Sequence, residues 1–298
     1  MKFFEAYHAL LDSVMINCIL GLSQYVVMRA GIFSLATTGL AALGGYCAGF
    51  LVLRAGVPLP VAWLAGVMLG VLVGAFLSWP LARLRGVFQA IATISLVQLV
   101  QSLIYWAEPI TGGAGGLNGI PPAAQTPVIA LWLIIVLIGL AAIGSSDIGR
   151  AFDTIREDET LAATLGIKVS RYHLLAFALS GGIAASGGIL LGFHHYSLMP
   201  DAFGFDMVTN VLAYVVLGGI NSAAGALTGA VVLTGLPEIA RPLADQRTIA
   251  VGILLMACII YLPDGLVDTL RHKLRARRIA KVQRGASGVS SEEVADVS

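Results

Sequence analysis

The chain has 298 residues, of which 57% are hydrophobic and only 12% are charged; its mean hydropathy is +0.87 and its net charge +1. Soluble domains carry about 25% charged residues. The deficit excludes a soluble core of this size and indicates a polytopic membrane protein. A net charge this close to zero gives no indication of a nucleic-acid partner.

Apolar stretches close to the ~20 residues that a helix needs to cross a bilayer recur along the chain. They cover residues 9–28, 31–53, 60–80, 87–107, 127–145, 172–195, 206–221, 224–240 and 247–263. The fold predicted is therefore all-α, a bundle of about eight to nine transmembrane helices. The short pair 206–221 and 224–240, separated by the polar GGINSAAG, predicts either two short crossings or a broken hairpin inside the bundle.

The basic residues predict the orientation, because cytoplasmic loops carry an excess of Lys and Arg. With nine crossings and a cytoplasmic C-terminus, 14 of the 18 basic residues lie on the cytoplasmic side. The other side holds Lys2, Arg54, Arg241 and Arg247. Loop 108–126 has no basic residue and is predicted to lie outside.

Two regions follow from this pattern: a transmembrane domain at 1–268, which includes the charged loop 150–171, and a cytoplasmic tail at 269–298. The tail is basic and then rich in Ser, Gly and Glu, which predicts disorder. Its sequence RHKLRARRIAKVQR is typical of a charge cluster that stops membrane transfer, and it could also contact anionic lipid.

Gly66, Gly70 and Gly74 fall at i, i+4 and i+8 and form a stripe on one helix face, suited to tight helix packing. Spans 31–53, 60–80, 87–107 and 172–195 contain no Asp, Glu, Lys or Arg well inside the membrane. Ion-coupled pumps usually carry an ionisable residue at that depth, so their class is disfavoured.

No hydrolase, zinc-protease or nucleotide-binding motif is present, so neither an enzyme nor a cofactor bound by this chain is predicted.

The segment 150–171, RAFDTIREDETLAATLGIKVSR, is the only dense run of charge between two long apolar stretches. It cannot lie in hydrocarbon, so a helix on one membrane face is predicted, within reach of a soluble partner. Acidic residues early in the segment and Lys168 late in it suit a helix dipole. Gly166 can end the helix.

Five motifs, in order between about Gly31 and Pro263, resemble the permeases of branched-chain amino acid ABC importers, most closely their M-type subunit. They are GIFSLATTGLAALGGYCAGFL, LARLRGVFQAIATISLVQLVQ, TGGAGGLNGIP, GRAFDTIREDETLAATLGIKVSRYHLLAFALSGGIAASGG and VLGGINSAAGALTGA. Three departures stand out: Thr160 replaces the Glu of the E-A-A-x-x-x-G signature, Ala226 the Pro of a GP pair, and the usual Gln near Ala36 is missing.

The resemblance implies a permease that translocates branched-chain or other hydrophobic amino acids across a bacterial inner membrane. It implies a second permease subunit, two cytoplasmic ATPases that bind ATP, an extracytoplasmic binding protein and membrane lipid as partners. Carried over by motif, the coupling loop comprises Arg156, Glu157, Asp158, Glu159, Ala162, Ala163 and Gly166. A permease for urea, amides or a sugar is the first alternative, and an ion-coupled carrier the second.

Overall fold

The computed structural model describes residues 2–81, 83–122 and 124–239, together with residues 256, 265 and 267. Within these residues the protein is a bundle of helices with one short hairpin of two-residue strands, which confirms the all-α prediction. The elements are α1 (Lys2–Arg29), α2 (Thr37–Leu53), α3 (Leu59–Leu81), α4 (Val87–Trp106), α5 (Glu108–Thr111), η1 (Gly113–Gly115), β1 (Leu117–Asn118), α6 (Thr126–Ser145), α7 (Asp147–Glu157), α8 (Glu159–Thr164), α9 (Val169–His195), β2 (Ser197–Leu198), η2 (Pro200–Phe203), α10 (Phe205–Gly218) and α11 (Ala223–Ile239).

Eight of the nine predicted spans correspond to described helices, and the ninth, 247–263, lies outside the described residues, as does the tail at 269–298. Six helical segments among the described residues are long and apolar enough to cross a membrane, and α2 and α11 are shorter apolar helices. A multi-pass membrane protein follows, while the predicted count of eight to nine crossings is not confirmed.

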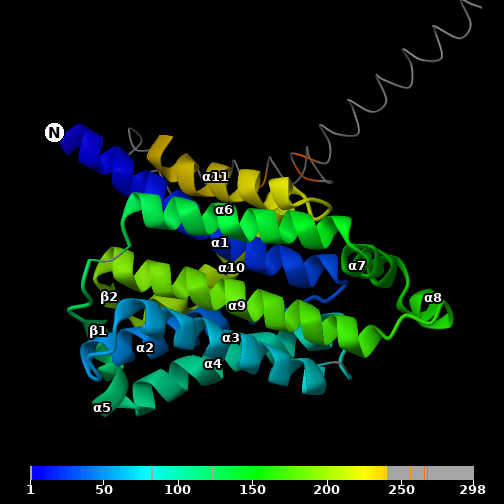
Figure 1. Ribbon diagram of the computed structural model, residues 1–298, viewed down its shortest axis with the longest axis horizontal. Helices are drawn as coiled ribbons and strands as arrows, with labels where there is room; N and C mark the ends of the chain where they lie inside the picture. Colours follow the sequence, from blue (N-terminus) through cyan, green and yellow to red (C-terminus); the bar gives the residue numbers. More distant parts are fainter. Residues whose placement is uncertain are drawn as a thin grey trace, which may run out of the picture.

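The long helices run side by side, with the connections gathered at the two ends (Figure 1). The N-terminus, α5 and the β1–β2 hairpin lie at one end, and α7 and α8 at the other. In the hairpin, Leu117 pairs with Leu198 and Asn118 with Ser197. Glycines with positive φ shape the loop before it, among them Gly112 (80°) and Gly116 (66°), as the turn composition of TGGAGGLNGIP predicts.

Helix α9 lies at the centre of the bundle and packs against α1, α2 and α3. Small residues make this arrangement close.

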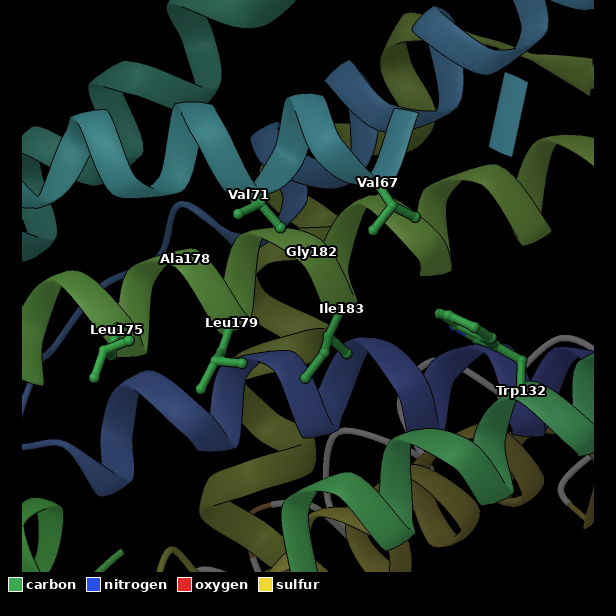
Figure 2. Close-up of a pocket in the computed structure, with 8 residues that line it drawn as sticks. All are labelled: Val67, Val71, Trp132, Leu175, Ala178, Leu179, Gly182 and Ile183. Atoms are coloured by element: carbon green, nitrogen blue, oxygen red, sulfur yellow. The ribbon is translucent and has the colours of Figure 1, made fainter. Parts of the chain in front are cut away.

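Between α3, α6 and α9 lies an apolar groove, whose eight lining residues include Val71, Trp132 and Leu179 (Figure 2). The lining residues supply only apolar side chains, the Trp132 indole and a glycine, so the groove has little chemistry for recognising a polar solute.

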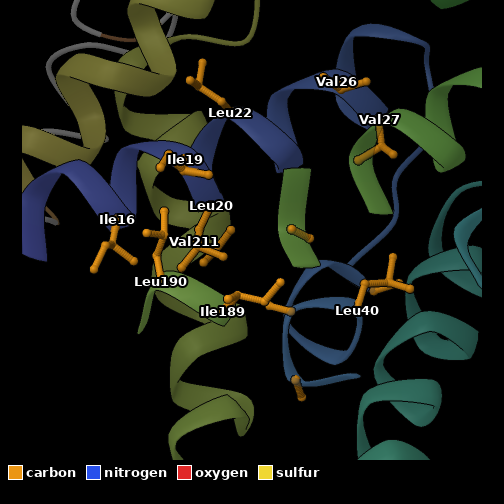
Figure 3. Packing of buried hydrophobic residues seen from close by; sticks show 14 of the residues in the cluster. Ile16, Ile19, Leu20, Leu22, Val26, Val27, Leu40, Ile189, Leu190 and Val211 are labelled. Atoms are coloured by element: carbon orange, nitrogen blue, oxygen red, sulfur yellow. The ribbon is translucent and has the colours of Figure 1, made fainter. Parts of the chain in front are cut away.

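The largest hydrophobic core cluster joins α1, α2, α9 and α10 (Figure 3). Ile16, Ile19 and Leu20 of α1, Leu40 of α2 and Ile189 of α9 are each 0–1% exposed. Burying such a side chain contributes about 1.5–3 kcal/mol in water, but lipid is itself apolar. In a membrane these contacts therefore act mainly through close packing.

The predicted span 31–53 is wrong at its start, because α2 begins only at Thr37. The chain before it is irregular and returns to the bundle interior, where it is stabilised by side chains of α1 and α4. Gln24 Nε2 donates to Ser34 O (2.7 Å), Gln24 Oε1 accepts from the Thr37 hydroxyl (2.6 Å), and Leu35 N donates to Thr93 Oγ1 (2.9 Å). These bonds satisfy backbone groups that lipid could not, which permits irregular chain inside the bundle.

Candidate functional site

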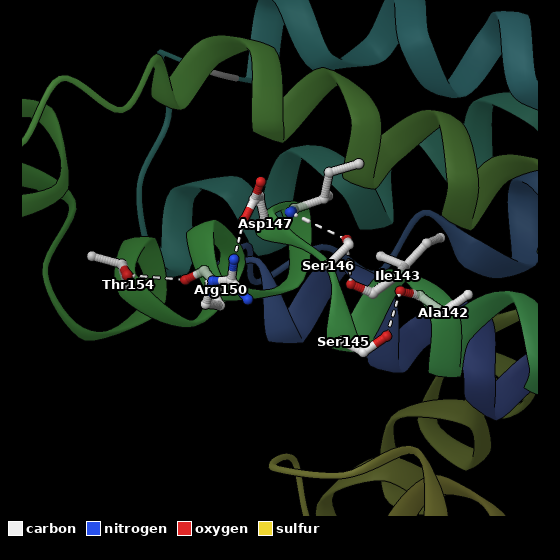
Figure 4. Close-up of polar contacts among 8 residues, drawn as sticks. Ala142, Ile143, Ser145, Ser146, Asp147, Arg150 and Thr154 are labelled. Atoms are coloured by element: carbon white, nitrogen blue, oxygen red, sulfur yellow. Dashed lines mark hydrogen bonds and ion pairs between the residues drawn. The ribbon is translucent and has the colours of Figure 1, made fainter.

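The candidate site is the α7–α8 segment, which begins at a sharp corner after α6 (Figure 4). Ser146 forms the corner: its hydroxyl donates to Ile143 O (2.7 Å) and accepts from Ile148 N (3.2 Å). It therefore caps the N-terminus of α7 in the usual way for a serine. Asp147 in the first turn pairs with Arg150 and places a negative charge at the positive end of the helix.

Helix α7 is anchored to the membrane bundle along one face. Arg29, the last residue of α1, donates from Nε to Asp153 Oδ1 (2.8 Å) and from an Nη to Oδ2 (2.9 Å). The Phe152 ring is buried and meets Tyr172 of α9 edge-on, with centroids 6.2 Å apart. At Gly31, whose φ is +77°, a Cβ would lie 3.0 Å from the Arg156 Cα, so the chain after α1 runs directly against α7.

The sequence predicted one helix in the charged segment 150–171, ending at Gly166, and the structure divides this segment into two helices at Asp158. The Asp158 backbone is extended (φ −155°, ψ 112°), which ends α7 at Glu157. Its Oδ1 accepts from Thr160 N (2.8 Å), Leu161 N (3.1 Å) and the Thr160 hydroxyl (2.5 Å), so that Asp158 is the N-cap of α8. The Thr160 hydroxyl first, and then the Leu161 and Thr160 backbone N–H groups, hold the pKa of this carboxyl below its usual value.

Gly166 ends α8, as its position in the sequence predicts. Its φ is +84°, its N–H donates to Ala163 O (3.1 Å), and Ile167 N donates to Ala162 O (3.1 Å). These two bonds form a Schellman motif, which requires the left-handed backbone that glycine adopts without strain.

The exposed surface of α8 and its C-cap residue includes two large apolar side chains. Leu161 and Leu165, four residues apart, are 54% and 67% exposed, and Ala163 is exposed as well. Ala162, by contrast, is 0% exposed within this chain, so Ala163 is the exposed one of the two alanines predicted to dock. Large exposed apolar side chains on a short helix at a bundle end are typical of a surface that another protein covers.

The other predicted coupling residues surround this surface. Arg156 is half-buried in the last turn of α7, and Glu157 is exposed beside it. Glu159 forms an ion pair with Arg85 of the α3–α4 connection (3.3 Å). Sequence reasoning missed Leu161, Leu165 and Arg85; the apolar spacing of the two leucines in a charged segment was the signal for the first two.

The glycine stripe forms a second candidate site, for helix packing. A Cβ at Gly70 would overlap the Gly181 carbonyl oxygen, and one at Gly74 would overlap the Phe177 carbonyl oxygen, both in α9. At Gly66, a Cβ would lie 2.8 Å from Gly44 O of α2. All three positions are buried, and any side chain there would force the backbones apart.

Among the described residues no group of three His, Cys, Asp or Glu side chains is close enough to hold a metal ion. What the α7–α8 segment offers is a shaped, anchored surface with an apolar centre and charged surroundings. Together with the apolar helices of the bundle, this surface belongs to a multi-pass membrane protein.

Residues 7–263 match the family described as branched-chain amino acid transport system / permease component, and the chain belongs to that family. It is 30% identical to the high-affinity branched-chain amino acid transport system permease protein LivM of Salmonella typhimurium, over 88% of this chain and 70% of that protein. The LivM protein of Escherichia coli is 29% identical over the same shares.

The autoinducer 2 import system permease protein LsrC of Salmonella typhi is 28% identical, over 80% of this chain and 72% of its own. No solved structure matches the chain. The chain is therefore the permease component of a transport system.

Proposed function

We propose that this permease is one subunit of an ABC importer in a bacterial inner membrane and that cytoplasmic ATPases drive it through α8. The observation that carries the proposal is the exposed leucine pair, Leu161 and Leu165, on a helix that projects from the end of the bundle. The bundle itself offers no energy source, so an external one must act on a surface of this kind.

The anchors of the segment give this surface a mechanical path into the membrane. The Arg29–Asp153 pair links α7 to α1, and the Arg85–Glu159 pair links α8 to the connection between α3 and α4. The chain then continues into α9, which packs against α1, α2 and α3. A movement of α8 can therefore be passed through α9 to α1, α2 and α3.

The cargo proposed is a branched-chain or other hydrophobic amino acid, as the names of the LivM relatives indicate for those proteins. A second permease would complete the pathway, two ATPases would hold the ATP, and an extracytoplasmic binding protein would deliver the solute. With the charged segment 150–171 cytoplasmic, the hairpin end faces outside and receives the binding protein.

The test is uptake by the assembled complex in proteoliposomes, with the ATPases and binding protein present. Ala163→Glu adds a charge that docking would have to desolvate, and Gly166→Val places a β-branched residue at φ +84°. Both should lose uptake and substrate-stimulated ATP hydrolysis while inserting normally. Ser145→Glu, an equal charge at an exposed position before α7, is the control and should transport normally.

Leu161→Ala with Leu165→Ala tests the docking surface directly. Burying a leucine contributes about 1.5–3 kcal/mol, so the double variant should bind the ATPase at least tenfold more weakly. Normal uptake in the glutamate, valine and double alanine variants would refute the coupling role.

The similarity to LsrC, an autoinducer 2 import system permease protein, favours a second candidate function: import of another small polar solute. Competition for uptake distinguishes the two candidate cargo classes. Valine and isoleucine should reduce uptake of labelled leucine, while urea and sugars should not. Uptake that continues without ATP and follows an ion gradient would instead indicate a secondary carrier.

A further inference from the structure

The exposed faces of the membrane helices divide into two kinds. On α3 the exposed side chains are apolar throughout, with Leu64, Leu72 and Phe76 61–69% exposed. The exposed face of α6 is also apolar between its ends, with Leu131 and Ile138 60–65% exposed. Faces of this composition suit contact with lipid chains.

Helices α4 and α10 differ. Ser95, Gln98 and Ser102 are exposed on α4, and Thr209 and Asn210 are exposed on α10. The spacing of three and four residues places the α4 side chains on one stripe of that helix. The stripe has an apolar border, in which Leu99 and Leu103 are about half exposed.

Helices α4 and α10 are linked through buried residues and through η2. Val97 of α4 and Val208 of α10 belong to one buried cluster, against which Leu212 packs. Nearer the hairpin end, Gln101 Nε2 donates to Pro200 O (2.9 Å) and the Tyr105 hydroxyl donates to Asp201 Oδ1 (2.5 Å). The exposed polar residues of α4 and α10, the polar surface of the bundle, therefore lie on two helices that share a buried cluster and both contact η2.

This surface is costly if lipid covers it. Gln98 lies near the middle of the 20-residue α4, and neither it nor Asn210 has a hydrogen-bond partner among the residues that the structure describes. An unpaired amide in hydrocarbon costs several kcal/mol. Water or a polar solute removes this cost, and a lipid chain cannot.

We propose that Ser95, Gln98, Ser102, Thr209 and Asn210 line a water-filled path between this chain and a second permease of the same fold. The proposal rests on the function proposed above. The apolar border formed by Leu99 and Leu103 would seal against the partner, while the polar stripe would stay wet. The stripe offers amide and hydroxyl groups, which both donate and accept. It therefore suits a small zwitterion or a neutral polar solute, because these groups can form hydrogen bonds with such a solute without binding it tightly.

The test is the reaction rate of single cysteines with a water-soluble methanethiosulfonate in the assembled complex, with Cys18, Cys47 and Cys258 replaced by serine. Gln98→Cys and Asn210→Cys are the path positions. Leu72→Cys on α3 and Ile135→Cys on α6 are exposed controls near the middle of their helices. Because only the thiolate reacts and it requires water, the path positions should react at least about tenfold faster.

Saturating leucine with loaded binding protein should slow the reaction at residue 98 and leave residue 72 unchanged. Rates at 98 and 210 equal to those of the controls would overturn the proposal, whether lipid or a dry subunit contact covers the face. These rates do not depend on how the complex is energised. Loss of the coupling role of α8 would thus leave this result standing, and the two failures are distinguishable.

Discussion

Arg29 and Asp153 form a two-point ion pair that joins the last residue of α1 to the middle of α7, 124 residues later in the chain. The Arg29 side chain is 15% exposed and that of Asp153 is 45% exposed. The pair thus lies where α1 of the membrane bundle meets α7, and it holds these two helices in one orientation.

A double-mutant cycle should detect this pair. Arg29→Ala and Asp153→Ala should each lower stability, and the double variant should lose less than the sum. We expect a coupling of about 1 kcal/mol, at the low end for charge-assisted bonds because Asp153 is half in solvent. Thermal unfolding in detergent measures it, with Arg150→Ala as a control on an exposed pair at the surface of α7. Strict additivity would contradict a structural role for the pair.

Gly70→Leu should destabilise the bundle, because the side chain would have to enter the space of the Gly181 backbone. Overpacking of this kind costs about 1–3 kcal/mol, and more where backbone cannot move. Gly139→Leu on α6 is the matched control, since a Cβ there meets nothing within 4 Å. The measurement is the melting temperature and the yield of assembled complex. Equal behaviour of the two leucine variants would mean that the stripe is not a packing contact.

The Asp158 cap should weaken in acid. Its folded pKa is lowered by the bonds from Thr160 and Leu161, so its stabilisation is present above the unfolded pKa, near ~3.9, and is lost as the pH falls through the lower folded value. Hydrogen exchange in residues 159–164 should therefore speed up below about pH 4, after correction for the intrinsic rate. Asp158→Asn, which keeps an acceptor oxygen but does not titrate in this range, should abolish the pH dependence. A dependence that persists in the asparagine variant would assign it to another group.

Single cysteines should report the orientation of the chain. In a background without native cysteines, Gly115→Cys should react with a membrane-impermeant reagent in intact cells, and Ser146→Cys and Ser287→Cys should not. The first two positions lie at opposite ends of the bundle, and residue 287 lies in the tail outside the described residues. Labelling at 146 or 287 with protection at 115 would reverse the proposed topology.

Apolar length predicted most of the helices from sequence, because bilayer thickness imposes it on each span separately. The start of α2 could not be predicted this way. It depends on Gln24 of α1 and Thr93 of α4, which form hydrogen bonds with the irregular segment before α2. The break between α7 and α8 could have been predicted from the sequence, because Asp158 precedes Thr160 and Leu161 as a helix N-cap residue does. The burial of Ala162 was not, because it depends on how the short helix lies against its own chain.

The glycine contact between α3 and α9 also limits how the bundle can move. Where backbone touches backbone, as at Gly70 and Gly181, no side chain can change rotamer to let one helix slide along the other. Spin labels at exposed positions of the two helices, Leu72 and Leu174, should accordingly keep one narrow distance distribution through the transport cycle. With that result, α3 and α9 would move as one body, and any opening of the pathway would have to come from other parts of the bundle.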